Sequence, residues 1–224
     1  MRYYKYCRGK FLAVIPITKI LPLVTLSEIA KIQQGLQFRK GLDDLLPGTC
    51  RLIQIRDFDE QGELRSDWET GLLRFDPPSS IERYLLQAGD ILFLARGLRN
   101  FAWTVPGPLP EVVAVGYFLT IRPNSAIIHP EYLAWYLNSE PTRAHLRNAA
   151  AQGTHMPVVN RASFEQLSIP LPPMAKQIAI AKLEALRRRE LGLLRRLEVL
   201  RQSQLAAAAL YAANRYDKLP SKGY

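Results

Sequence analysis

The sequence contains few of the residues that build metal centres and disulfide frameworks. Only two cysteines, Cys7 and Cys50, and three histidines occur among its 224 residues. A structural zinc site needs about four Cys, His or carboxylate ligands at close spacing, so no such site is expected. We predict no metal or other cofactor. The scarcity of cysteine also excludes a disulfide framework and favours a reducing, cytoplasmic location.

Long uninterrupted hydrophobic segments are also missing. Residues 11–26 are mostly apolar and follow several basic residues, as in a signal peptide, but Pro16, Lys19 and Pro22 interrupt them. No small-x-small cleavage pattern follows. No segment reaches the ~18 apolar residues that a membrane-spanning helix requires. We therefore expect no membrane association, and we interpret residues 1–22 as a leader or a first strand.

Motifs of enzymes that modify or cleave DNA are absent from the chain. There is neither a GxGxxG turn nor a G-x-x-x-x-G-K-[ST] phosphate loop. Asp76-Pro77-Pro78-Ser79 differs from an adenine-methyltransferase motif, because serine stands where an aromatic ring would stack on the flipped base. The acidic residues at 57–63 surround Gly62 and are interpreted as a solvated turn. We expect a binding protein and not an enzyme.

Positive charge is present in excess and increases toward the C-terminus. The chain has 30 Lys and Arg residues against 20 Asp and Glu residues, a net charge of +10. Residues 1–150 carry 18 basic and 15 acidic residues, whereas residues 151–224 carry 12 and 5. Such an excess favours a polyanionic partner, but charge by itself does not choose between nucleic acid and an acidic membrane face.

Short apolar runs separated by Gly and Pro predict a mixed α+β fold for the first ~170 residues, with a curved, mainly antiparallel sheet. We expect strands at 51–55, 91–95 and 112–121. A short helix is expected at 25–32, with Thr25 and Glu28 forming a capping box. A second helix is expected at 130–138, because a proline there is typical of a first helical turn.

A linker and a long helix are predicted after this domain. Three prolines between Ile169 and Pro173 remove three backbone donors and predict an extended linker. From Met174 to Ala213, apolar residues recur at alternating spacings of three and four, which predicts a helix of about 40 residues, or ~60 Å. The domain cannot cover so long a seam, so we expect self-association or a partner helix. The seam comprises Ala179, Leu183, Leu186, Glu190, Leu193, Leu197, Leu200, Gln204, Ala207 and Tyr211.

Several motifs, in order, resemble those of the specificity subunits of type I restriction–modification systems. They are Leu26–Gly35, Gly89–Gly97, Tyr132–Ser139, Gly153-Thr154, Phe164–Pro173 and Lys176–Leu183, followed by the leucine-rich helix. The proline linker with the Gln-Ile-Ala helix start is the most specific of them. The resemblance implies a target recognition domain at 23–168, a linker at 169–173, a spacer helix at 174–213 that forms a coiled coil, and a tail at 214–224.

The resemblance also implies a function. It implies a non-catalytic subunit that reads one half of a bipartite target in double-stranded DNA. Such a subunit docks a DNA methyltransferase subunit and, indirectly, a motor and restriction subunit. Typical family members carry two recognition domains and two antiparallel spacer helices, whereas this sequence has one of each. We therefore expect a homodimer of half-subunits, or a truncated or alternative specificity chain. A regulatory protein that pairs through its helix with a full-length specificity subunit or a methyltransferase is the alternative.

Three glycine-containing polar segments are the predicted DNA contacts, because Gln pairs bidentately with adenine and Arg with guanine. The first is a turn after the helix at 25–32, the second follows the strand at 91–95, and the third precedes the linker. Ordinary polar loops would have the same composition. The candidate DNA-binding residues are Gln33, Gln34, Gln37, Arg39, Lys40, Arg96, Arg99, Asn100, Gln152, Thr154, His155 and Arg161. The candidate dimer or partner-helix residues are Leu183, Leu186, Leu193, Leu197, Leu200 and Tyr211.

Overall fold

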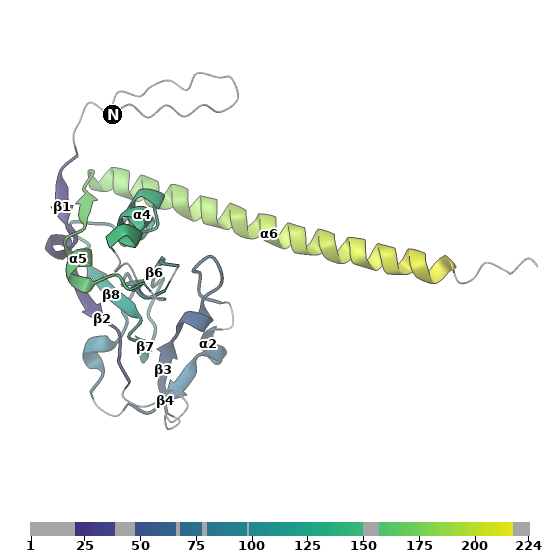
Figure 1. The fold of residues 1–224 in the computed structure, drawn as a ribbon, viewed down its shortest axis with the longest axis horizontal. Helices are drawn as coiled ribbons and strands as arrows, with labels where there is room; N and C mark the ends of the chain where they lie inside the picture. The colour runs from purple at the N-terminus through teal and green to yellow at the C-terminus, as the bar shows by residue number, and fades with distance from the viewer. Residues whose placement is uncertain are drawn as a thin grey trace, which may run out of the picture.

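A computed structural model describes residues 21–38, 48–65, 68–77, 80–97, 99–149 and 157–216. Small β-sheets and short helices form a globular part, and the long helix α6 (Met174–Tyr216) starts on it and extends far beyond it (Figure 1). The predicted α+β class and the long C-terminal helix are confirmed. No helix of the described residues combines the length and hydrophobicity needed to cross a bilayer.

A four-stranded antiparallel sheet, β2-β8-β5-β6, forms the centre of the globular part. Its strands are β2 (Ala30–Gln34), β5 (Ile91–Leu94), β6 (Ala102–Thr104) and β8 (Phe118–Pro123). Both faces of β5 are buried, because its odd-numbered residues point into one hydrophobic cluster and its even-numbered residues into another. A strand buried on both faces needs a continuous apolar run, and the segment Ile-Leu-Phe-Leu supplies it.

A three-stranded sheet, β4-β3-β7, covers one face of the central sheet. In it, β3 (Cys50–Ile53) pairs antiparallel with β4 (Leu73–Phe75) and parallel with β7 (Val112–Ala114). Aromatic rings fill the space between the two sheets. The ring of Phe58 lies 5.0 Å from that of Phe101, 5.6 Å from that of Trp103 and 5.5 Å from that of Phe118, between centroids. This cluster fixes the turn that follows Phe58.

Helices cover the other face of the central sheet. They are α1 (Leu26–Ile29), α3 (Pro130–Leu137) and α5 (Arg161–Glu165). The predicted capping box is present, since the Thr25 N–H donates to the Glu28 carboxylate at 2.6 Å. That bond lowers the pKa of Glu28. Helix α3 starts at the predicted proline. Further described elements are α2 (Trp68–Gly71), α4 (Glu140–Ala149) and 3-10 helices at Ile55–Asp57 and Glu82–Tyr84.

Three local predictions are corrected by long-range pairing. Helix α1 ends at Ile29, because the next five residues pair with β8 as strand β2. Gln33 and Gln34 therefore lie in a strand and not in a turn. The segment predicted as one strand at 112–121 is two strands, because the chain turns at Gly116. The start of the predicted linker forms β9 (Ser168–Pro170), which pairs with β1 (Leu23–Thr25).

The side chain of Gln177 attaches α6 to the globular part. It is 1% exposed, and its oxygen accepts from the His129 backbone N–H at 2.8 Å. Its nitrogen donates to the Pro172 carbonyl at 2.8 Å and to the Ile127 carbonyl at 3.3 Å. A glutamine suits this place because its amide is both donor and acceptor. The Gln-Ile-Ala helix start thus binds both the loop at 127–129 and the linker at Pro172.

We expect the Gln177→Leu variant to be less stable than the wild type by about 3 kcal/mol, because one buried N–H and two carbonyls lose their partner. Urea unfolding at one fixed protein concentration measures the loss. Gln202→Leu is the matched control, since Gln202 lies in the exposed part of the same helix and contacts Glu198. Equal unfolding midpoints for the two variants would contradict the role assigned to Gln177.

Tyr132 connects α3 to β9. Its ionisation makes the folded state less stable at alkaline pH. Its hydroxyl donates to the Pro170 carbonyl at 2.8 Å, and burial, with a smaller contribution from Tyr136, raises the pKa of Tyr132 to about 12. The neutral hydroxyl is favoured in the folded state, so its contribution is complete below pH 10 and is lost as the pH rises through about 12.

We expect Tyr132→Phe to lower the free energy of unfolding by about 1 kcal/mol at neutral pH. Between pH 10 and 12 the wild type should lose stability more steeply than this variant, because the variant has no hydroxyl to ionise at that site. Urea midpoints measured across that range test the effect. Tyr117→Phe, at an exposed site, should keep the wild-type slope. Parallel curves for the wild type and Tyr132→Phe would refute the assignment.

Candidate nucleic-acid interface

One face of α6 packs on the globular part. The start of the helix contacts α3, and the turn at 59–63 lies beside it farther along. Gln177, Ala181 and Glu184 are buried on this face, and Arg188 is partly buried. Spacings of three and four residues place these side chains in one line along the helix. This contact fixes the direction in which the helix leaves the domain (Figure 1).

The predicted heptad seam lies on the opposite side of α6. Leu183, Leu193 and Leu197 are 68%, 56% and 43% exposed, respectively. Leu186, Leu200 and Tyr211 are exposed as well. Every side chain from Leu193 to Asn214 is exposed. The described part of the domain therefore leaves the leucines of the seam uncovered, and the pairing of the seam with another helix stays a prediction.

Two of the predicted polar segments meet at one end of the central sheet. Gln34 ends β2, and its side-chain N–H donates to the Gly116 carbonyl at 3.0 Å. Arg96 follows β5, and its guanidinium carbon lies 5.3 Å from the ring centroid of Tyr117. The turn between β7 and β8 thus brings the two segments together. We call Gln34, Gln37, Arg96 and Tyr117 the loop end; all four side chains are exposed.

Two glycines allow the backbones to approach closely at the loop end. A Cβ atom at Gly35 would lie 2.5 Å from the Val115 carbonyl oxygen. A Cβ atom at Gly116 would lie 2.8 Å from Cγ of Gln37. Both distances are shorter than van der Waals contact. Glycine is needed at Gly35, where the atom is a backbone oxygen, whereas at Gly116 the exposed Gln37 side chain can move aside. The polar residues beside Gly35 are thereby held against the turn that carries Tyr117.

The third predicted segment borders the loop end through its backbone. Arg96 forms an antiparallel bridge with Val158, and the Gly97 N–H donates to the Pro157 carbonyl at 3.0 Å. Gly97 has a φ of +116°, which residues with a side chain rarely adopt. The candidates Arg39, Lys40, Gln152, Thr154 and His155 lie outside the described residues. Their contact with DNA stays a prediction.

The remaining candidates make contacts within the protein. Arg99 donates to two carbonyls of the turn at 59–63, at 2.9 and 3.3 Å. Asn100 donates to the last carbonyl of β5 at 2.8 Å. Arg161 starts α5 and pairs with Glu165 at 2.7 Å. Arg99 and Asn100 therefore hold the loop that follows β5, while a role for either in DNA binding is still untested.

The sequence analysis did not single out two further residues, Tyr117 at the loop end and Arg143 beside α6. Tyr117 is 43% exposed beside Arg96. Arg143 on α4 reaches Asn138 and lines the space between the globular part and residues 184–195 of α6. The signal for Tyr117 was the glycine before it, which divides an apolar run into two strands. Arg143 had no local signal, because its position depends on how α4 and α6 each pack against α3.

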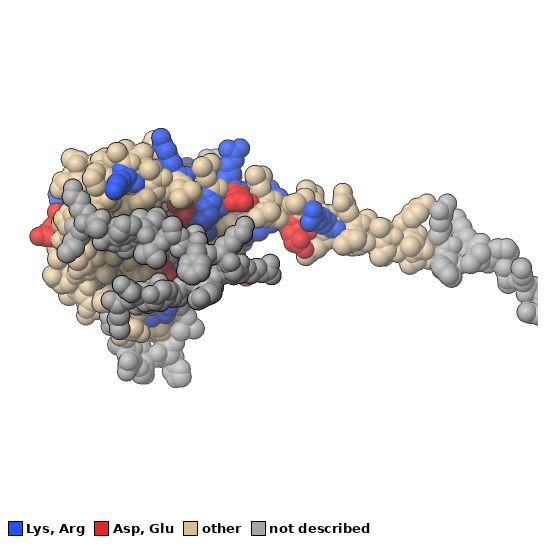
Figure 2. Space-filling view, turned by 90° about the horizontal axis from the view of Figure 1, so that it is seen from above, with Lys and Arg blue, Asp and Glu red and all other residues tan. Residues whose placement is uncertain are grey.

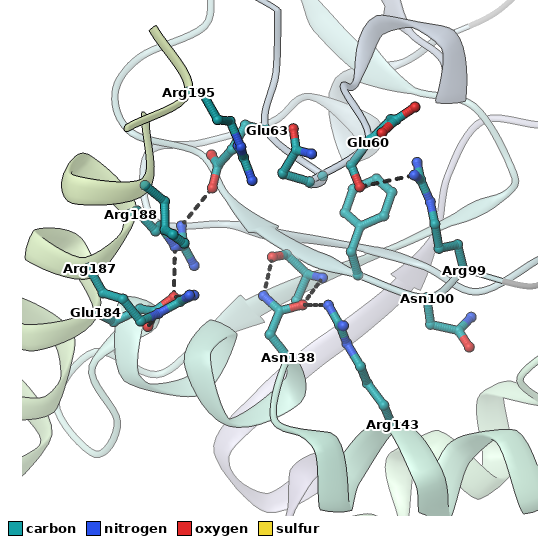
Figure 3. Close-up of a pocket in the computed structure, with 15 residues that line it drawn as sticks. Glu60, Glu63, Arg99, Asn100, Asn138, Arg143, Glu184, Arg187, Arg188 and Arg195 are labelled. Carbon is teal, nitrogen blue, oxygen red and sulfur yellow. Dashed lines mark hydrogen bonds and ion pairs between the residues drawn. The ribbon is translucent and has the colours of Figure 1, made fainter. Parts of the chain in front are cut away.

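A cleft of about 320 Å³ lies between the globular part and α6 (Figure 3). Figure 2 shows Lys and Arg side chains gathered over the start of α6 and the adjoining surface. We call this space the junction cleft. It is lined by Glu60, Gln61, Gly62, Glu63, Arg99, Asn100, Phe101, Ala102, Asn138, Arg143, Glu184, Arg187, Arg188, Leu191 and Arg195.

Ion pairs form one wall of the junction cleft. Glu184 accepts from Arg187 at 2.6 Å and from Arg188 at 3.1 Å. These hydrogen bonds, that of Arg187 first, lower the pKa of Glu184. Arg188 also lies 3.4 Å from Glu63, across the cleft. Burial raises the pKa of Glu63, although Arg188 acts in the opposite direction. The contact connects α6 to the turn at 59–63.

The acidic residues at 57–63 form the predicted turn. The Asp59 carboxylate accepts from the backbone N–H groups of Gln61 and Glu63 at 2.8 and 2.9 Å. Gly62 has a φ of +79°, and a Cβ there would lie 2.7 Å from the Phe101 ring. The turn is therefore explained by local structure. Within the described ranges, no group of three or more His, Cys, Asp or Glu residues is placed to hold a metal ion.

The loop end and the start of α6 both fall within a stretch that matches a known family. The family model is described as "Type I restriction modification DNA specificity domain", and it matches residues 23–189. The chain belongs to this family. A curated type I restriction enzyme specificity subunit from Methanocaldococcus jannaschii is 31% identical over 106 residues, which are 46% of this chain and 25% of that protein.

Solved structures of type I specificity subunits have a similar fold. The HsdS subunit from Thermoanaerobacter tengcongensis aligns with a TM-score of 0.59 and 23% identity, over 94% of this chain and 53% of that one. A chain from a study of complex assembly in the type I R-M system aligns with a TM-score of 0.62 and 23% identity, over 92% and 52%. The chain thus spans a quarter to about half of the length of these relatives.

Proposed function

We propose that the chain binds double-stranded DNA through the loop end and reads one half of a bipartite target. The observation that carries the proposal is the convergence of Gln34, Arg96 and Tyr117, from three separate segments, on one exposed surface. Glutamine and arginine are the side chains that pair bidentately with adenine and guanine in the major groove. Membership in the specificity-domain family and the net charge of +10 agree with a DNA partner.

We propose further that two chains pair through the seam of α6. A two-fold dimer would place two identical loop ends at a fixed separation, so the target would be an inverted repeat with a central gap. We infer that the chain contributes recognition and no catalysis. A DNA methyltransferase subunit would dock on this dimer, with a motor and restriction subunit attached indirectly. This partnership implies a cytoplasmic location, where the DNA of a bacterial or archaeal cell lies.

Selection of bound duplexes from a randomised pool, with and without the methyltransferase subunit, tests the proposal. We expect enrichment of one short sequence in two inverted copies. Affinity should fall steeply with salt, with a slope of about −0.9 in log K against log salt for each phosphate contact. Binding without any sequence preference, even with the methyltransferase present, would contradict the proposal.

Mass measurement of the isolated chain separates this function from a regulatory one. A half-subunit that reads DNA by itself should form a dimer of twice the 25.4 kDa chain mass. A regulatory protein that pairs with a full-length specificity subunit or a methyltransferase should be monomeric until that partner is added. The exposed seam is compatible with both, so this measurement distinguishes them.

A further inference from the structure

Five arginines from three parts of the chain line the junction cleft. Arg187, Arg188 and Arg195 come from α6, Arg143 comes from α4, and Arg99 comes from the loop between β5 and β6 (Figure 3). The guanidinium group is planar, stays charged at all physiological pH values and matches the geometry of a phosphate. Five such groups around a cleft of about 320 Å³ are more than a hydrophobic contact between helix and domain requires.

The carboxylates of the cleft neutralise only part of this charge. Glu184 binds Arg187 and Arg188, and Glu63 reaches Arg188 at 3.4 Å. Among the described residues, no carboxylate lies within 4.0 Å of a guanidinium nitrogen of Arg99, Arg143 or Arg195. These three arginines therefore leave a surplus of positive charge in the cleft.

Arg143 adds a buried donor that has no acceptor. One of its terminal nitrogens donates to the Asn138 side-chain oxygen at 3.2 Å. Its Nε is buried and has no hydrogen-bond partner. A buried N–H of a charged group without an acceptor is costly, so Arg143 carries donor capacity that the described residues leave unused.

We propose that the junction cleft is an oxyanion site that takes a backbone phosphate of DNA, separate from the base-reading loop end. The two sites share one loop, since Arg96 and Arg99 are three residues apart. Their Cα atoms are at most ~11 Å apart along the chain. The major groove of a duplex is about 12 Å wide, so one duplex can reach both. That the phosphate belongs to DNA rests on the proposed function, whereas the existence of an oxyanion site in the cleft does not.

The glutamates of the cleft oppose an anion only weakly. In Figure 3 the Glu60 carboxylate is directed away from the arginines of α6. The Glu63 carboxylate lies 3.4 Å from Arg188 and is already engaged with a guanidinium group of α6. Glu184 is already bound by two guanidinium groups. An entering phosphate would therefore meet the surplus charge of Arg143 and Arg195.

The proposal is tested first with inorganic phosphate on the full chain. Titration should shift the side-chain Nε–H signals of Arg143 and Arg195 in 15N-edited NMR spectra. The Arg143→Gln/Arg195→Gln variant should lose saturable phosphate binding. Arg195→Gln alone should weaken it without changing the contacts of the buried residues Gln177, Ala181 and Glu184, because Arg195 is exposed. Arg147→Gln and Arg196→Gln, changes on the same two helices outside the cleft, should bind as the wild type does. Unchanged binding in the double variant would overturn the proposal.

The second arm uses the duplex selected by the wild-type chain. The double variant should bind every sequence more weakly, and the salt slope should decrease by about 1, with the preferred bases unchanged. If the double variant loses phosphate binding but keeps its DNA affinity, the cleft does not bind a DNA phosphate. Its ligand would then be a free oxyanion. If the double variant keeps its DNA affinity but loses methyltransferase binding, the cleft binds an acidic protein surface. This result would also overturn the proposal of a DNA phosphate site. If the wild-type chain does not bind DNA, the proposed function is contradicted. The titration with inorganic phosphate still tests whether the cleft is an oxyanion site.

Discussion

The Leu193→Asp/Leu197→Asp variant is expected to be a monomer where the wild-type chain is a dimer. Both leucines lie in the exposed part of α6, one helical turn apart on the seam. Each substitution removes the ~1.5–3 kcal/mol that a buried leucine contributes and places a carboxylate in the helix pair. An unpaired charge buried there costs several kcal/mol more. Analytical ultracentrifugation measures the mass directly.

Val199→Asp/Ala206→Asp is the matched control for this change. Val199 and Ala206 are exposed residues of the same stretch of α6, and both lie away from the seam. This variant carries the same added charge and the same number of substitutions, so it should stay dimeric. Far-UV circular dichroism should show equal helix content in both variants. If the seam variant remains a dimer, or if both variants dissociate equally, the seam is not the pairing surface.

Arg96→Ala is expected to weaken binding to the selected duplex by a factor of about 5 to 150, which corresponds to the ~1–3 kcal/mol of one bidentate base contact. The loss should be accompanied by relaxed preference at one base pair of each half-site. Arg96 follows a strand buried on both faces, and its guanidinium lies over Tyr117, so it is held in place before DNA arrives. Fluorescence anisotropy with target and substituted duplexes measures both effects.

Arg83→Ala is a control with the same local chemistry. The guanidinium of Arg83 lies 4.6 Å from the ring centroid of Tyr84, so this variant also removes an arginine stacked on a tyrosine. Arg83 lies outside the loop end, and its loss should change the affinity for all sequences slightly and equally. Equal losses for Arg83→Ala and Arg96→Ala, without a change in preference, would assign Arg96 to general charge rather than to base reading.

The elements that the sequence predicts correctly are those with a local cause. The capping box at Thr25, the proline that opens α3 and the apolar run of β5 each follow from neighbouring residues. The long helix was predictable because its spacing of three and four residues continues without proline from Met174 onward. The exposure of the leucines from Leu193 onward follows from the length of the helix, whereas Leu183 and Leu186 are exposed because they face away from the domain.

The parts that the sequence did not predict depend on contacts between distant segments. β1 pairs with β9 across more than one hundred residues, and residues 30–34 form a strand because β8 lies beside them. The loop end depends on the same kind of pairing, since Tyr117 reaches Arg96 only when β8 lies beside β5. The polar residues were recognisable individually, but their convergence required the sheet.

Sequencing of methylated DNA from cells that contain the methyltransferase subunit, with and without this chain, tests the central claim most directly. With the chain, we predict methylation at one motif made of two inverted half-sites and a gap. Without the chain, that methylation should be absent, and with Arg96→Ala it should be reduced or spread to related sequences. An identical methylation pattern in the presence and absence of the chain would contradict the account.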